Sequence, residues 1–107
     1  MTGVFKALAD PTRRKILHLL TARPMTAGEI AAHFDVSKPT LSAHFAVLRE
    51  ADLIGSEKDG KHVTYWLNAS VLAEALLAFT DTLGLDLSAA SARKSRAPKL
   101  AKGRRTS

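Results

Sequence analysis

A run of short hydroxylic and basic side chains lies near the middle of the sequence, between Val36 and Leu53. Hydroxyl groups donate and accept hydrogen bonds and a lysine ammonium binds anions, so these side chains could contact the base edges and phosphates of a nucleic acid. Exposed helix faces usually carry long charged side chains, whereas short ones let a large partner come close. The candidate contact residues are Ser37, Lys38, Thr40, Ser42, Ala43 and His44.

The remaining reactive side chains show no arrangement typical of catalysis or of metal binding. The sequence has no cysteine, which excludes disulfides, thiolate metal sites and thiol catalysis. The four histidines, His18, His33, His44 and His62, fall on four different predicted elements. No nucleophile with a base, Gly-rich phosphate loop or carboxylate pair stands at motif spacing. We therefore expect no enzymatic activity, no cofactor and no metal site.

The hydroxylic run is predicted to lie on the second of two short helices. Thr26 followed three residues later by Glu29 is a capping-box pattern, which predicts a helix over 27–34. Ser37 is predicted to cap the next helix, which extends to about residue 51. Its expected core residues recur at helical spacing: Leu41, Phe45 and Leu48. Two such helices form a helix-turn-helix, whose second helix enters the major groove of DNA, although short capped helices also occur in many other small domains.

The segment that follows predicts a β-hairpin, because Asp59-Gly60 is a strong turn signal between two strand-like runs. The second strand alternates, and we expect its buried side to be Val63, Tyr65 and Leu67. The lysines that flank the turn are Lys58 and Lys61. A hairpin after a helix-turn-helix is the wing of a winged helix. Its tip could contact the minor groove or phosphates, and the hairpin could equally serve to complete the core.

Apolar stripes at both ends of this domain predict a homodimer. Further helices are expected over 4–9, from Asp10 as a cap to about residue 23, and over 70–83, where Gly84 ends the last one. A small core leaves the last helix little to cover, so we expect it to pair with a second copy beside the first helix; intramolecular packing is the alternative. The predicted dimerisation residues are Val4, Phe5, Leu8, Leu72, Leu76 and Phe79.

The net charge of +6 belongs to the end of the chain. Residues 1–84 contain nine Lys/Arg and nine Asp/Glu, so the whole excess lies in residues 85–107. A basic tail indicates a polyanion nearby, most simply nucleic acid, and added solubility is the alternative. We expect a DNA-binding and dimerisation domain over 1–84 and a basic, mostly disordered tail over 85–107.

The length of 107 residues predicts one small domain. No run approaches the roughly 20 apolar residues that a membrane span needs, so we expect no membrane association. The first residues lack the pattern of a signal peptide, and we expect a cytoplasmic protein.

Three stretches are specific in combination: ALADPTRRKIL over 7–17, SKPTLSAHFAVLREADL over 37–53, and EKDGKHVTYWLN over 57–68. They resemble the ArsR/SmtB family of winged-helix repressors, and within it the small SdpR-like autorepressor branch, over about residues 4–83. The resemblance implies a mainly α fold of five helices with a two-stranded wing, and a homodimer. It also implies an inverted-repeat operator in double-stranded DNA and repression of the protein's own operon.

The sequence departs from this family where many members bind metal. Ala31 and His33 occupy the positions of two family thiolates, and the last helix has no histidine. We therefore expect the family's sensing chemistry to be absent. One alternative is a regulator that responds to zinc or nickel at a different site. A second alternative is a regulator that depends on a separate sensor protein. The chain could also be a nonspecific DNA-packaging protein or a protein-interaction module.

Overall fold

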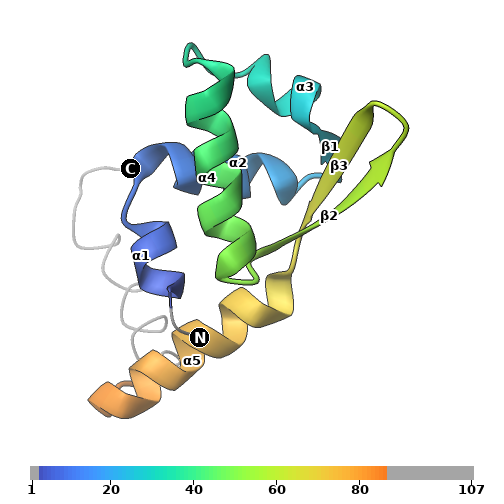
Figure 1. The fold of residues 1–107 in the computed structure, drawn as a ribbon. Coiled ribbons are helices and arrows are strands. Elements are labelled where there is room, and N and C mark those ends of the chain that lie inside the picture. The colour runs from blue at the N-terminus through green and yellow to red at the C-terminus, as the bar shows by residue number, and fades with distance from the viewer. Residues whose placement is uncertain (1–2, 87–107) are drawn as a thin grey trace, which may run out of the picture. The chain divides into compact units, whose positions relative to one another are not determined.

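Five helices and a three-stranded antiparallel sheet make up residues 3–86, the part of the chain that this computed structural model describes (Figure 1). In chain order the elements are α1 (Val4–Leu8), α2 (Pro11–Leu20), β1 (Met25–Thr26), α3 (Ala27–Ala31), α4 (Lys38–Glu50), β2 (Ile54–Asp59), β3 (His62–Leu67) and α5 (Ala69–Leu83). Within α5 the chain divides into two compact units, one ending at Ala75 and the other beginning at Leu76. The five predicted helices and the hairpin are confirmed, whereas most of the predicted tail lies outside the described residues.

Asp10 begins α2, as predicted. Its Oδ2 accepts hydrogen bonds from the backbone N–H groups two and three residues later, at 2.8 and 3.2 Å. We predicted that this helix continues to about residue 23, but it ends at Leu20. The chain leaves the helix there because Met25 and Thr26 pair with β3, a tertiary contact that the local sequence does not show.

The capping box predicted for α3 is confirmed. Thr26 Oγ1 accepts from the Glu29 N–H at 3.1 Å, and Glu29 Oε1 accepts from the Thr26 N–H at 2.8 Å. The helix ends at Ala31, before the predicted residue 34. The N–H groups of His33 and Phe34 bond to carbonyls three residues earlier, at 3.0 Å each, so the chain closes in a tighter turn.

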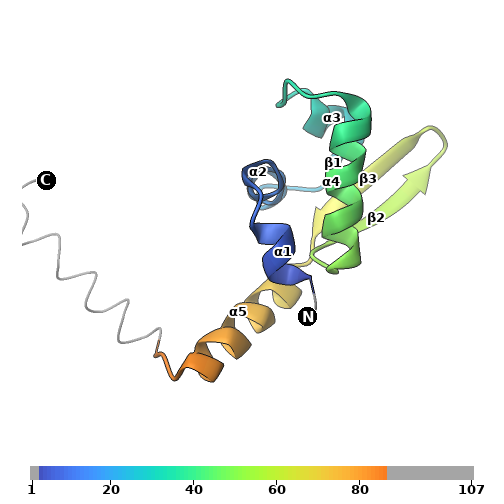
Figure 2. The same ribbon diagram turned by 60° about the vertical axis from the view of Figure 1, so that its left-hand side comes forward.

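The sheet has one strand more than predicted. The hairpin of β2 and β3 turns at Asp59-Gly60, as expected, with Gly60 at φ +63°. The added strand is β1, which pairs with β3 in the order β1-β3-β2. Two residues are too few to show the alternation by which strands are found in sequence. The β2–β3 turn projects away from the helices (Figures 1 and 2).

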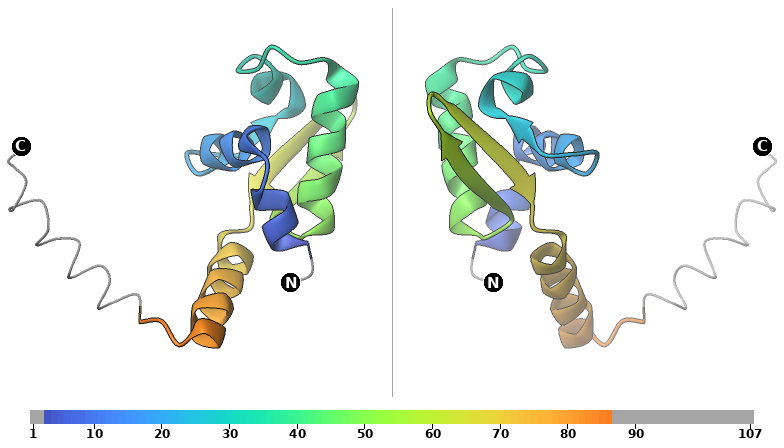
Figure 3. Two further views of the ribbon diagram at one scale, coloured as in Figure 1. Left: turned by 90° about the vertical axis from the view of Figure 1, so that its left-hand side faces the viewer. Right: turned by 90° about the vertical axis from the view of Figure 1, so that its right-hand side faces the viewer.

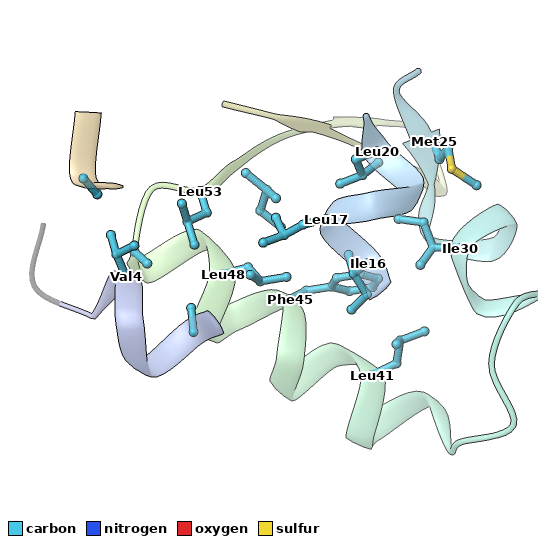
Figure 4. Close-up of a cluster of buried hydrophobic side chains, with 14 residues drawn as sticks. Val4, Ile16, Leu17, Leu20, Met25, Ile30, Leu41, Phe45, Leu48 and Leu53 are labelled. Atoms are coloured by element: carbon cyan, nitrogen blue, oxygen red, sulfur yellow. The ribbon is translucent and has the colours of Figure 1, made fainter. Parts of the chain in front are cut away.

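The core of the first unit lies between α2, α4 and the sheet. Figure 4 shows side chains of α2 facing those of α4, with Leu53 beside them. The largest fully buried side chains are Ile16, Ile30, Leu48, Leu53 and Val4. Phe45 stacks on Tyr65 with ring centroids 4.3 Å apart. Tyr65 and Leu67 pack against this core, which confirms the expected buried side of β3 for these two residues.

Helices α4 and α5 end in the same hydrogen-bonded motif. Asp52 after α4 and Gly84 after α5 adopt positive φ, +60° and +73°. In each case two successive N–H groups donate back to carbonyls of the last turn, at 2.8 to 3.1 Å. The predicted end of the last helix at Gly84 is confirmed. Asp52 has the left-handed conformation that usually favours glycine.

Candidate nucleic-acid interface

Helix α4 lies along one edge of the first unit in both views of Figure 3. Leu41, Phe45 and Leu48 face the core, and this leaves the opposite side of the helix exposed. We call its short side chains, together with the lysine beside them, the reading face: Lys38, Ser42, Ala43 and Ala46. Sequence reasoning missed Ala46, although its position three residues after Ala43 could have placed it there.

The first turn of α4 is held by two hydroxyl side chains. Ser37 Oγ accepts from the Thr40 N–H at 3.3 Å and donates to Thr40 Oγ1 at 2.9 Å. Both residues are exposed, as expected of contact residues. Because Thr40 Oγ1 is the acceptor in this bond, its own O–H remains able to donate to a partner.

His44 is less accessible than the other predicted contact residues. Its side chain is 17% exposed, and Nδ1 lies 3.2 Å from Arg13 Nη1 and 4.0 Å from Asp10 Oδ2. The ring is therefore directed at α2 instead of outward beside Ala43. This orientation does not favour the predicted contact of His44 with DNA, because the ring faces another helix of the same chain.

Lys15 fixes the turn between α3 and α4. Its Nζ donates to the carbonyl of His33 at 3.0 Å and stands 4.9 Å from the centroid of the Phe34 ring. The lysine precedes this carbonyl by 18 residues, so no local pattern in the sequence points to the contact. The turn between the two helices of the helix-turn-helix is thus bonded to α2.

A groove of about 210 Å³ opens between α3 and α4, next to the reading face. Its walls are mainly apolar, and Lys38 and Ser42 also line it. The other lining residues are Ala27, Gly28, Ala31, Leu41 and Phe45. An apolar recess beside hydroxyl and ammonium groups suits a surface with methyl and polar groups side by side, such as a thymine edge next to its phosphate.

The wing carries both signs of charge near its turn. Lys58 and Lys61 are exposed there, as predicted, and so are Glu57 and Asp59. On the other side of β3 from the core, Trp66 lies over Gly55. The wing therefore offers two cations at its tip without forming a uniformly basic surface.

Two helix caps carry carboxylates with lowered pKa values. Desolvation alone would raise the pKa of Asp10, but the hydrogen bonds from the N–H groups of Arg13 and Thr12, together with the electrostatic effects of the His44 and Arg13 side chains, lower the pKa overall. The N–H of Thr26 is the main cause that lowers the pKa of Glu29, and Arg23 adds to it through a hydrogen bond and an ion pair at 3.4 Å. Both caps are therefore ionised at neutral pH.

The predicted dimerisation residues differ in exposure. Val4 is fully buried in the core of its own chain, because its side chain points from α1 toward the core, so we remove it from the candidate dimer surface. Leu8 and Leu72 are partly buried against the same core. Phe5 is 46% exposed, and in the second unit Leu76 and Phe79 are 40% and 46% exposed.

The described residues do not form a metal site or a membrane span. Within residues 3–86, His, Asp and Glu side chains form no group of three that could hold a metal ion. His33 is exposed and Ala31 partly buried at the positions where we expected the family thiolates to be replaced. No helix in this range is long and apolar enough to cross a membrane.

A helix-turn-helix followed by a hairpin wing defines a winged-helix DNA-binding protein. Residues 8–56 match a helix-turn-helix domain family. The chain is 49% identical over 76 residues to the transcriptional repressor SdpR of Bacillus subtilis (strain 168), covering 71% of this chain and 84% of SdpR. It is 34% identical over 76 residues to the arsenical resistance operon repressor of Staphylococcus aureus, covering 71% and 73% of the two chains.

Solved structures agree with these relatives. The crystal structure of the ArsR family transcriptional regulator RHA00566 superposes with a TM-score of 0.67 and 36% identity, over 76% of this chain and 86% of that one. The chain belongs to the ArsR/SmtB family of winged-helix, DNA-binding transcriptional regulators. The family and fold inferred from the sequence motifs are confirmed.

Proposed function

We propose that this regulator is a dimeric repressor that binds an inverted-repeat operator in double-stranded DNA and represses its own operon. The observation that carries the proposal is the reading face, where small exposed side chains stand beside Lys38 on the second helix of a helix-turn-helix. Two similar proteins are called repressors, one of them of an arsenical resistance operon. The regulator acts in the cytoplasm, where a bacterial operator lies.

Each side chain of the reading face suits a particular contact in the major groove. The Ser42 hydroxyl can donate to or accept from a base edge, and the methyl groups of Ala43 and Ala46 suit the methyl group of thymine. Lys38 can bind guanine or a phosphate. Lys58 and Lys61 contact phosphates or the adjacent minor groove from the wing.

A second copy supplies the second half of the contact. Leu76, Phe79 and Leu83 recur along α5 at helical spacing and are 40%, 46% and 55% exposed. Burying such a stripe against its two-fold mate stabilises a dimer, since each large apolar side chain contributes about 1.5–3 kcal/mol when fully buried. The dimer presents two reading faces to successive major grooves about 34 Å apart. Residues 1–84 form the binding and dimerisation domain, and the basic residues of 85–107 add attraction to phosphates.

The test begins with selection of binding sites from a random DNA pool by the full-length chain. Fluorescence anisotropy on the selected site then compares Ser42→Glu with His18→Glu, which adds the same charge at an exposed position of α2. We expect Ser42→Glu to weaken binding at least about tenfold and His18→Glu to stay near wild type. Sedimentation should show the same dimer for both variants.

Two results would contradict the proposal. One is operator binding by Ser42→Glu as tight as that of wild type. The other is the lack of any preferred site, because a specific repressor should prefer its operator over random DNA by roughly 10³-fold or more. That second outcome would favour nonspecific packaging of DNA.

A further inference from the structure

Arg13, in the first turn of α2, connects three helices. Its Nε donates to the carbonyl of Ala7 at 2.8 Å and its Nη2 to the carbonyl of Lys6 at 2.9 Å, both at the end of α1. Its Nη1 lies 3.2 Å from Nδ1 of His44 on α4. We propose that Arg13 is a positioning residue for DNA binding, which sets the orientation of the reading face through His44. This inference rests on the proposed function, because it assumes that α4 contacts the operator.

The chemistry of the contact fixes the state of the His44 ring. A guanidinium has donors and no acceptor, so Nδ1 of His44 must be the acceptor and carry no proton. The ring proton of the neutral form is therefore on Nε2. The guanidinium is planar and rigid, and two of its nitrogens are bound to carbonyls of α1. The third nitrogen, Nη1, is then held in one place, which limits where the ring can lie.

The position of His44 on α4 allows its contact with Arg13 to affect the orientation of the reading face. His44 stands between Ala43, which is exposed, and Phe45, which is buried. Holding a ring at this intermediate position resists rotation of α4 about its own axis. A carboxylate also lies beside the ring: Asp10 Oδ2, which caps α2, is 4.0 Å from Nδ1.

Arg14 provides a matched control within the same turn of α2. Its Nη1 donates to the carbonyl of Leu8 at 2.8 Å, so it also binds the end of α1, but it has no hydrogen bond to α4 within residues 3–86. If Arg13 acted only by capping α1, the loss of either arginine would have similar effects. If Arg13 orients α4, only its loss should weaken operator binding.

The test measures anisotropy of the full-length chain on the selected operator. Thermal unfolding checks each variant, and binding is compared below the lowest Tm. We expect Arg13→Ala and Arg13→Lys to weaken binding about tenfold, since a hydrogen bond to a charged group is lost. Arg14→Ala should stay within about twofold, as is usual for surface substitutions. Nitrogen-15 NMR should show an unprotonated His44 Nδ1 whose shift changes in Arg13→Ala and not in Arg14→Ala.

Substitutions of His44 test the other side of the contact. Asn places an oxygen acceptor near the position of Nδ1, so His44→Asn should retain affinity, whereas His44→Leu should lose it. Combining Arg13→Ala with His44→Leu should cost little more than either change alone, because both remove one interaction.

Four outcomes overturn the inference. The first three are equal losses of operator affinity in Arg13→Ala and Arg14→Ala, equal losses of affinity in His44→Asn and His44→Leu, and additive losses of affinity in the double variant. The fourth is a change of about one in the slope of log K against log salt for Arg13→Ala, since that would indicate direct contact with a phosphate. If Ser42→Glu weakens binding while Arg13→Ala does not, the positioning role of Arg13 is refuted and the proposed function stands. If Ser42→Glu binds like wild type, the proposed function fails and this inference with it.

Discussion

Gly55 on β2 leaves room for the indole of Trp66, and filling that room should destabilise the fold. A Cβ on Gly55 would lie 2.4 Å from Trp66 Cε2, 2.5 Å from Nε1 and 2.6 Å from Cζ2. Ordinary carbon contacts are about 3.5–4.0 Å, so the indole must move by about 1 Å. Overpacking of this kind costs about 1–3 kcal/mol, and we expect Gly55→Ala to lower the free energy of unfolding by that amount.

The sign of the effect should reverse when the indole is removed. Glycine within a strand costs about 0.5–1 kcal/mol relative to alanine, so in a Trp66→Thr background Gly55→Ala should stabilise by about that much. Trp66 is the only tryptophan of the chain, and its fluorescence reports directly on its own displacement in Gly55→Ala. Urea unfolding followed by circular dichroism gives the four stabilities of the double-mutant cycle. A neutral or stabilising Gly55→Ala in the presence of Trp66 would show that the indole does not press on this backbone.

Three further perturbations follow from the fold. Asp52 has φ +60°, so Asp52→Gly should raise stability and Asp52→Ala lower it by about 0.5–1 kcal/mol, as read from Tm. Leu48 is fully buried, so Leu48→Ala should cost about 2–5 kcal/mol in urea unfolding, and a smaller loss would mean that the site collapses. Asp10 and Glu29 have lowered pKa values, so their contribution is complete above the unfolded pKa of about 4 and is lost as pH falls through the folded values. Asp10→Asn with Glu29→Gln should flatten stability against pH in this acid range; an unchanged slope would contradict the lowered values.

The parts of the fold that sequence predicts are those determined by neighbouring residues. Asp10, Thr26 and Ser37 bond to N–H groups two or three residues away, so their caps are visible as local patterns. The turn at Asp59-Gly60 is equally local. The helical spacing of α4 likewise identified both its core side and most of its exposed side.

The parts that sequence did not predict depend on contacts between distant residues. Strand β1 exists because it pairs with β3, about forty positions along the chain, and its two residues carry no pattern of their own. His44 reads as a helix surface residue until Arg13, 31 positions earlier, is placed beside it. Val4 is part of an apolar stripe in the sequence, and the sequence does not show whether that stripe faces the core or a second copy. The packed structure places Val4 in the core.

Several cations of the folded region are bound to the protein's own backbone. Arg13, Arg14, Lys15 and Arg23 each donate to a main-chain carbonyl. A side chain held in this way must break its hydrogen bond before it can bind a phosphate. We therefore expect the folded region to bind random DNA weakly and to dissociate from it quickly. Nonspecific attraction to phosphates is then left mainly to the basic residues of 85–107. The dwell time of the folded region on DNA then depends on whether the sequence fits.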